Sequence, residues 1–536
     1  MLYLPENGGS FSEGVFGNPR FINPILAISD TDRDLSSLVY SGLMKKTPDG
    51  NIVTDLAESY EVSEGGLTYT FKIREGAMFH DKTPITSNDV IFTVEKIKDS
   101  LIKSPMQAVW EGVVATRDPE DSRTVVFKLT QPYASFLENA TVGIIPQHIW
   151  ESIDPEMFSF SDNNLQAVGS GLYRIQKIDQ NKAGQIEHVR LSAFDGYAGD
   201  APFIKNIDFK FYQSEADLIR AYRKGRVDQI SSVSPKNAKA LTDEGYEPTT
   251  TTLSRVFGMF FNPNRNEYLR NSTIVTAIDL AIDKENIVNT VLYGFGTIID
   301  GPVPASLMKS DEEIAVPESA SESLNQANVL LDSAGFRMNE RTGIREKDGK
   351  QLRFSISTAD VAELRQASDL IKSDLAKIGI EVSVKVFDVG ALNQNIIRPR
   401  EYEALFFGQV IRNDTDLFAF WHSSQRNDPG LNVAVYTNNR VDKLLEEIIS
   451  TPDPETRDEK VGEFNDIVRA DSPAIFIYSP DLIYMESGKV KNIALDQITN
   501  SSERFLGISE WYVRTDAVWE FLQPKTEESV DADIEQ

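Results

Sequence analysis

The sequence predicts an α/β protein that also contains a compact α+β unit. The main observation is a βαβ pattern over residues 352–386. There an alternating run, an apolar stripe at helical spacing and a second alternating run follow one another. A crossover of this kind implies two parallel strands joined by a right-handed connection. A second observation is strict apolar–polar alternation over residues 67–73 and again over 125–129, which is typical of half-buried strands.

The first third of the chain is predicted to begin as extended chain and to continue into the α+β unit. Residues 8–24 are rich in Gly, Asn and Pro, and residues 30–44 carry apolar positions at helical spacing. Thr86 is followed three positions later by Asp89, which indicates a capping box at the start of a helix. That helix and the two alternating strands define the α+β unit, which extends from about residue 46 to residue 164.

The remainder of the chain is predicted to be mixed α/β. Residues 165–257 combine strands and helices, and residues 272–292 carry a broad apolar face typical of one long helix. A strand over residues 402–407 is expected to extend the sheet that the βαβ unit begins. The last residues, 526–536, contain five acids and no aromatic residue, so we expect disorder there.

Composition excludes several classes of function. The 536 residues include 54 basic and 82 acidic ones, which gives a formal net charge of −28 and argues against nucleic acid or an anionic membrane as partner. The absence of cysteine excludes disulfides, thiolate metal sites and cysteine nucleophiles. No apolar run approaches the roughly 18 residues of a membrane span. Because residues 1–10 lack the features of a signal peptide, we expect either a cytosolic protein or one whose export segment was removed.

No known catalytic spacing is present. The chain lacks GxxxxGK[ST], HExxH and GxSxG, and its four histidines are widely separated in sequence: His80, His148, His188 and His422. A glycosidase-type pair among the 82 acids is not excluded, but nothing marks a particular pair. We therefore expect a protein that is not an enzyme and that holds neither a metal ion nor a cofactor.

A candidate binding region follows the strand predicted at residues 402–407. In open parallel sheets, ligands bind beyond the carboxyl ends of the strands. The residues that follow combine a glycine, which lets a ligand approach the backbone, with polar groups and an aromatic wall: Gly408, Gln409, Arg412, Asp414 and Trp421. The alternative interpretation is a polar loop before a buried aromatic helix, with Asp414 or Asp416 as the helix N-cap.

Segments along nearly the whole chain carry a family resemblance. They include DLSSLVYSGL, DGNIVTDLAESY, LTYTFKIR, GSGLY, AIDLAIDKENI, LLDSAGF and LAKIGIEV, beginning at residues 34, 49, 67, 169, 277, 330 and 375. In this order they resemble the family 5 extracellular solute-binding proteins, the oligopeptide- and dipeptide-binding components of ABC importers. One such segment would be weak evidence, whereas seven in collinear order are strong evidence.

The resemblance implies a two-lobed Venus-flytrap protein of the type II periplasmic-binding-protein class with an extra α+β domain. The first lobe would be discontinuous and comprise residues 1–45, 165–257 and 478–525. Residues 46–164 would form the extra domain, residues 258–477 the second lobe, and residues 526–536 a tail. The implied protein is a monomer outside the cytoplasm, anchored by an N-terminal segment. It would capture short peptides and deliver them to a membrane permease and its ATPase.

The resemblance also implies that both lobes contribute to the ligand site. Gly408, Gln409, Arg412 and Asp414 would face residues of the first lobe, which we expect to be Phe21, Asn23, Ser41 and Gly42. Trp421 is a further candidate, and Trp110 is a candidate that an aromatic core position would explain equally well.

This chain departs from the family pattern at the expected anchor. In peptide binders a Trp usually follows the glycine, and an Asp that pairs the ligand ammonium comes soon after; here these positions hold Gln409 and Arg412. Asp414 or Asp416 would take that role if the loop were one residue shorter. Otherwise Arg412 favours an anionic ligand group. Ser41 likewise replaces the usual acid before Gly42.

The sequence therefore leaves the ligand open. The alternatives to a peptide are an anionic small molecule, a metal chelate or an oligosaccharide, because relatives with this fold take several kinds of solute. A ligand sensor without transport is a further alternative.

Overall fold

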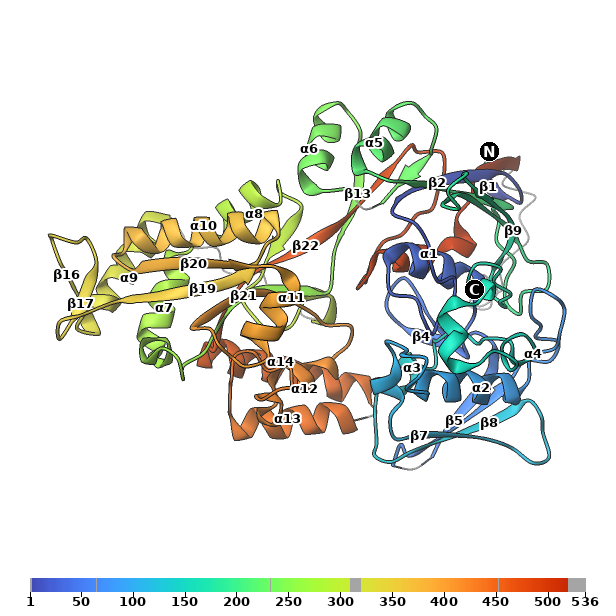
Figure 1. Cartoon of the computed structure of the whole chain (residues 1–536), viewed down its shortest axis with the longest axis horizontal. Helices are drawn as coiled ribbons and strands as arrows, with labels where there is room; N and C mark the ends of the chain where they lie inside the picture. Colours follow the sequence, from blue (N-terminus) through green and yellow to red (C-terminus); the bar gives the residue numbers. More distant parts are fainter. Residues whose placement is uncertain (1, 64, 232, 309–319, 452, 519–536) are drawn as a thin grey trace, which may run out of the picture.

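The computed structural model describes residues 2–63, 65–231, 233–308, 320–451 and 453–518, so the disorder predicted for residues 526–536 lies outside the described residues. Figure 1 shows two lobes connected by the long strand β22 (Ala474–Glu486), with a smaller α+β domain beside the first lobe. Within these ranges, no helix has both the length and the apolar character needed to cross a bilayer.

One sheet runs through both lobes in the order β20-β19-β21-β14-β22-β12-β2-β11-β10-β9, with β13 and β15 also paired to β22. The strands of the first lobe are β2 (Ser10–Phe16), β9 (Tyr173–Gln180), β10 (Ile186–Ala193), β11 (Asn206–Tyr212), β12 (Gln229–Ile230) and β13 (Pro248–Thr252). Those of the second lobe are β14 (Arg255–Phe261), β15 (Gly296–Ile298), β19 (Arg353–Ala359), β20 (Glu381–Phe387) and β21 (Ala404–Val410).

Helices cover both halves of this sheet. The helices of the first lobe are α1 (Asp30–Val39), α5 (Glu215–Arg223) and α6 (Pro235–Asp243). Those of the second lobe are α7 (Ser272–Ala281), α8 (Lys284–Val291), α9 (Ala320–Ser333), α10 (Ala362–Lys377), α11 (Val389–Ala391), α12 (Asp416–Trp421), α13 (Asn439–Ser450) and α14 (Pro454–Asp471). Small sheets add β1 (Leu2–Glu6) with β23 (Arg514–Val518), and β16 (Arg337–Met338) with β17 (Arg345–Lys347) and β18 (Lys350–Gln351).

The smaller domain is built around an antiparallel sheet of order β5-β6-β8-β7. Its elements are β3 (Met44–Lys46), β4 (Ile52–Thr54), β5 (Ala57–Val62), β6 (Thr68–Ile73), α2 (Ser87–Lys98), β7 (Val113–Arg117), β8 (Thr124–Leu129), α3 (Phe136–Asn139) and α4 (Gln147–Trp150). The predicted capping box is confirmed, since the Thr86 backbone N–H donates to Asp89 at 2.9 Å.

The predicted βαβ unit is also confirmed. Strands β19 and β20 are parallel over their full length, from Arg353↔Glu381 to Ala359↔Phe387, and α10 connects them. The predicted neighbouring strand pairs parallel to β19 at Ile356↔Ala404 and so extends the same sheet. Alternation places Phe354 and Ile356 in the core of the second lobe together with the apolar stripe of α10.

The prediction of one long helix over residues 272–292 is wrong, because the structure divides this segment into α7 and α8. The break falls at Ile282 and Asp283, where Asp283 accepts a hydrogen bond from the Asn286 N–H at 2.9 Å and so caps α8. The Asp283 N–H itself donates to Asp374 of α10 at 3.1 Å. An N-cap aspartate inside an apolar pattern thus ends one helix and begins the next.

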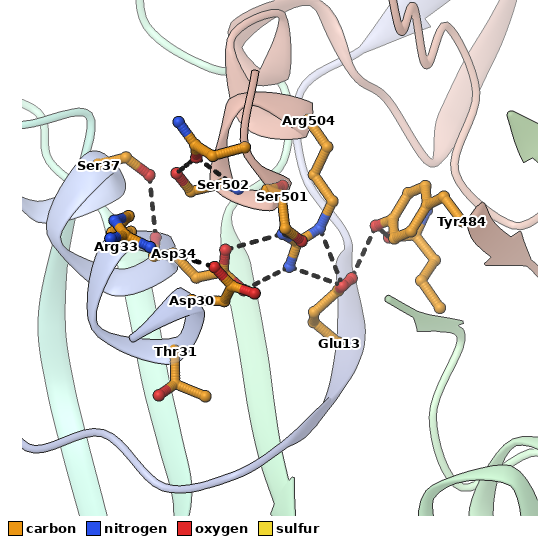
Figure 2. A network of polar contacts seen from close by, with 12 residues as sticks. Glu13, Asp30, Thr31, Arg33, Asp34, Ser37, Tyr484, Ser501, Ser502 and Arg504 are labelled. Carbon is orange, nitrogen blue, oxygen red and sulfur yellow. Dashed lines mark hydrogen bonds and ion pairs between the residues drawn. The ribbon is translucent and has the colours of Figure 1, made fainter. Parts of the chain in front are cut away.

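A buried ion network joins distant segments of the first lobe (Figure 2). Arg504 donates to both carboxylate oxygens of Asp34 in α1, at 2.8 and 2.6 Å. It also donates to Glu13 of β2 at 3.0 and 3.3 Å, although these two residues lie 491 positions apart. Tyr484 of β22 places its hydroxyl 2.7 Å from the second Glu13 oxygen. The network therefore connects β2, α1, β22 and the C-terminal segment that contains Arg504.

The network holds one cation and two carboxyl groups out of contact with solvent. Burial raises the pKa of Glu13 to about 7, and the Arg504 charge opposes that rise. The two short, parallel contacts of Arg504 with Asp34 have the bidentate geometry of a charged pair. Burial raises the pKa of Asp34 as well, and the Arg504 charge again opposes the rise.

Arg504→Leu is expected to lower the free energy of unfolding by about 3–5 kcal/mol, because it leaves two buried carboxyl groups without their cation. Urea denaturation followed by circular dichroism measures the change. Arg33→Leu is the matched control: Arg33 pairs with Asp30 at 3.3 Å, but its side chain is 42% exposed. The control should change the free energy by less than about 1 kcal/mol. Equal effects of the two substitutions would contradict the structural role of the network.

Candidate functional site

The strand β22 determines how the two halves of the sheet face each other. In the second lobe it is antiparallel to β14, which is antiparallel to β21, so β22 and β21 run in the same direction. In the first lobe β22 is antiparallel to β12, which is parallel to β2 and lies next to it. The carboxyl ends of the parallel strands of both lobes therefore point toward the place where β22 passes between them. Ligands of α/β sheets bind beyond such ends; we call the region between them the interlobe site.

Large apolar side chains are exposed at both sheet edges that border the interlobe site. At the second-lobe edge, Val386, Val389 and Val410 are 42%, 63% and 44% exposed. At the first-lobe edge, Phe16 at the end of β2 is 48% exposed, and Ile28, just before α1, is 61% exposed. Exposed apolar side chains at both edges could serve as walls of a binding site.

Two chain segments pass between the lobes at the back of this site. One is β22, and the other links β13 to β14 through Leu253. They lie side by side, since β13 pairs with β22 as far as Thr252↔Asp481 and the Leu253 N–H donates to the Pro480 carbonyl at 2.9 Å. Figure 1 shows this ribbon between the two lobes.

The structure corrects the predicted end of the strand at residue 407. The strand β21 continues to Val410, so Gly408 and Gln409 lie inside the sheet rather than in a loop. The Phe257 ring lies over Gly408, where an added Cβ would come within 2.6 Å of it. Gln409 is only 3% exposed, and its side-chain oxygen has no hydrogen-bond partner among the described residues.

The two candidate ligand anchors, Arg412 and Asp414, are both engaged within the protein. The Arg412 side chain donates to Asp416 twice, at 3.1 Å each, and Asp416 begins α12. Asp414 pairs with Arg457 of α14. Burial raises the pKa of Asp414, while the Arg457 charge acts in the opposite direction. Asp414 is thus held inside the protein, whereas 60% of the Arg412 side chain stays exposed beside Asp416.

The same loop contacts the smaller domain. Asn413 donates a hydrogen bond to Glu138 of α3, and the Thr415 hydroxyl lies 3.3 Å from the Tyr133 hydroxyl. The Ser135 hydroxyl reaches Asp414 at 3.5 Å. Burial raises the pKa of Glu138 to about 7, and the nearby acids of the loop act in the same direction. Sequence reasoning missed this contact because the two segments are 275 residues apart.

The four residues predicted from the first lobe have mainly structural roles. Asn23 is fully buried and donates to Asn164 at 3.1 Å. Gly42 packs against the backbone of Thr141, where a Cβ would come within 2.5 Å of the carbonyl oxygen. Ser41 is 5% exposed; burial raises the pKa of the nearby Asp55, and the Ser41 hydroxyl opposes that rise. Phe21 is partly exposed and packs against the core of the first lobe.

The prediction that Trp421 forms an aromatic wall of the site is also wrong. Trp421 has no exposed surface; it packs among Phe260, Tyr436, Phe464 and Phe476 in the core of the second lobe, with ring centroids 5.9–6.4 Å away. The alternative interpretation, a buried aromatic helix after a polar loop, describes α12, except that the N-cap is Thr415 rather than Asp414 or Asp416.

Trp110 is likewise a core residue, 1% exposed, in the smaller domain. The exposed Phe16 and Ile28 were missed, because periodicity shows which face of an element is apolar but not which strand end stays uncovered. Over the described ranges, no group of three or more His, Asp or Glu side chains is placed to hold a metal ion.

Glu138→Gln is expected to stabilise the protein above pH 7 and to have little effect below pH 4.5. The folded-state pKa of Glu138 is about 7 against an ordinary value of 4.5. Rising pH therefore ionises the unfolded chain first and lowers the free energy of unfolding, by about 3 kcal/mol once the folded pKa is passed. Melting temperatures of wild type and variant at pH 4.5 and pH 8 measure this.

Glu111→Gln, at an exposed position of the same domain, is the control and should leave the pH profile unchanged. A Glu138→Gln protein that is destabilised at pH 8 would show instead that the carboxylate is charged in the folded state.

Comparisons with known proteins agree with this architecture. The model of the bacterial extracellular solute-binding proteins, family 5 (middle), matches residues 51–430, more than half of the chain. The oligopeptide-binding protein AppA of Bacillus subtilis (strain 168) is 27% identical over 492 residues, which cover 89% of this chain and 87% of that protein. The dipeptide-binding protein of Escherichia coli (strain K12) is 22% identical over 507 residues, 90% of this chain and 91% of that protein.

Solved structures share the fold over nearly the whole chain. HbpA2 from Haemophilus parasuis superimposes with a TM-score of 0.79 at 19% identity, covering 95% of this chain and 100% of that one. AppA from Bacillus subtilis in complex with a nonapeptide gives 0.69 at 24% identity, with the same coverage of 95% and 100%. The expected family and two-lobed fold class are thus confirmed. This chain belongs to family 5 of the bacterial extracellular solute-binding proteins.

Proposed function

We propose that this protein captures short peptides between its two lobes and delivers them to the permease and ATPase of an ABC importer. The observation that carries the proposal is the pair of carboxyl-end sheet edges that face each other across β22, with exposed apolar side chains on both. Family membership supports it, as do two relatives named as oligopeptide- and dipeptide-binding proteins.

Peptide binding at such a site needs few specific side chains. A peptide in extended form offers main-chain groups for sequence-independent hydrogen bonds, and the apolar walls accept a range of side chains. Closure of the two lobes around the peptide would bury it, and a transporter distinguishes the closed shape from the open one. Of the contacts predicted from sequence, we retain Phe21, which is partly exposed, and Gln409, whose oxygen lacks a partner within the described residues.

We also propose where the protein works and how its chain is divided. It would act outside the cytoplasm as a monomer, attached to the outer face of the membrane by an N-terminal anchor. Residues 1–45, 165–257 and 478–525 would form the first lobe, 46–164 the extra domain and 258–477 the second lobe. Support for the boundaries near 257 and 478 comes from β22, which pairs with β14 and β15 of the second lobe as far as Pro480 and with β13 of the first lobe from Asp481.

Native mass spectrometry of the purified protein, followed by denaturing release, tests the proposal. We expect a heterogeneous set of short peptides, and protein stripped of them should rebind members of a synthetic library of two- to nine-residue peptides. A single non-peptide adduct, together with no retention of library peptides, would keep the fold and overturn the substrate.

Phe16→Glu is expected to weaken binding of library peptides by about tenfold or more, because it places a charge on the apolar wall of the first lobe. Phe160→Glu is the matched control, since Phe160 is 76% exposed but lies in the smaller domain, away from the interlobe site. Isothermal titration calorimetry with one retained peptide compares the two variants. Equal affinities of both would place the peptide elsewhere.

A further inference from the structure

Arg255 is the first residue of β14 and lies directly after the segment that enters the second lobe. It pairs with Val410 at the end of β21, so it sits on the second-lobe edge of the interlobe site. Its guanidinium Nε is buried and has no hydrogen-bond partner within the described residues. The described residues also place no carboxylate within 4.0 Å of its side chain.

An unpaired guanidinium in this position is unusual for this molecule. Arg345, Arg457 and Arg504 have side chains that are 4%, 17% and 0% exposed, and each contacts a carboxylate. Partial burial of Arg255 lowers its pKa, although guanidinium remains charged at any physiological pH. A charge that is partly removed from water without a partner costs free energy, which an added anion would offset.

The charged groups that act on Arg255 belong to the opposite lobe. They are Asp30 and Arg33 at the start of α1, which have opposite effects on its pKa. These two residues pair with each other at 3.3 Å. Arg255 therefore faces the first lobe across the interlobe site, where a bound solute would lie between them.

The surroundings of Arg255 suit a solute with an apolar body and one carboxylate. Phe257 lies two residues farther along β14, on the same face of the strand. Its ring stacks on Tyr478 with centroids 5.0 Å apart. Val410 is exposed beside Arg255. The planar guanidinium fork matches a carboxylate in bidentate geometry.

We propose that Arg255 binds a carboxylate of the captured solute, which in a peptide is the C-terminal carboxylate or an acidic side chain, and so determines specificity. This inference rests on the proposed function. It also moves the anionic anchor to Arg255 from Arg412, which pairs with Asp416 at 3.1 Å.

Three peptide sets tested on the full chain distinguish the two carboxylate sources. The first contains two- to nine-residue peptides without Asp or Glu and with a free C-terminus; the second contains the same peptides as C-terminal amides; the third contains amides with one Asp or Glu. We expect the wild-type protein to favour the first set over the second by about tenfold or more. Preference for the third set over the second, without preference for the first, would assign Arg255 to a side-chain carboxylate instead.

Arg255→Gln should lose about 30-fold or more in affinity for the preferred carboxylate set and bind the plain amides as wild type does. Unchanged amide binding also shows that the variant is folded. Arg341→Gln, at an exposed position of the second lobe remote from the site, is the control for loss of one positive charge.

Arg255→Gln could instead lose the same affinity for the carboxylate peptides as for the amides, and Asp30→Asn could reproduce that loss. This result would overturn the inference and would mean that Arg255 stabilises the contact between the lobes. Wild-type affinity of Arg255→Gln for every set would overturn it too, while the peptide-binding function stands. If the wild-type protein binds none of the three sets, the proposed function fails instead. The inference is then decided by whether the solute released from the purified protein carries a carboxylate.

Discussion

The continuity of β22 is the constraint on which the arrangement of this molecule depends. One strand supplies hydrogen bonds to β14 in the second lobe and to β12 and β13 in the first. The parallel strands of the second lobe run in the same direction as β22, and those of the first lobe run in the opposite direction. The carboxyl ends of both sets of strands therefore face the interlobe site. The interlobe site is therefore a consequence of backbone pairing, and the side chains on the two edges decide only which solute it accepts.

The ion network of Arg504 holds the first-lobe end of that strand in place. The first lobe is assembled from segments near both ends of the chain, so no local contact can fix their positions. Arg504, Asp34 and Glu13 do so at one buried point, and Tyr484 connects β22 to it. Buried charges tolerate few alternative partners. The network therefore does more to fix the relative positions of these segments than to raise the net stability of the fold.

Much of the architecture could be predicted from local patterns, but the site could not. Alternation and helical spacing gave the βαβ unit of β19, α10 and β20, and the spacing of Thr86 and Asp89 gave the start of α2. The same patterns missed the break at Asp283, because a capping aspartate resembles any polar position in a helix. Trp421 has a sequence environment that suits either a wall or a core, and only tertiary packing placed it in the core.

The charges of the loop after β21 illustrate the same limit. Arg412 and Asp414 were sensible candidates because they follow a parallel strand. In the structure, however, Arg412 pairs with Asp416, and Asp414 pairs with Arg457. Arg255 had no distinguishing signal in the sequence, since what sets it apart is the absence of a partner within the described residues. Such an absence depends on every element packed around the residue, and no local pattern contains it.

The hydrogen bond between Leu253 and Pro480 has a mechanical consequence. It joins the two segments that pass between the lobes into a narrow two-stranded ribbon, and such a ribbon is anisotropic. Bending it within its own plane would stretch one strand and compress the other, whereas bending it out of that plane changes neither length. The ribbon consequently resists rotation of the lobes within its plane more than rotation out of it. Out-of-plane bending of the ribbon is the motion that moves the two sheet edges toward or away from each other.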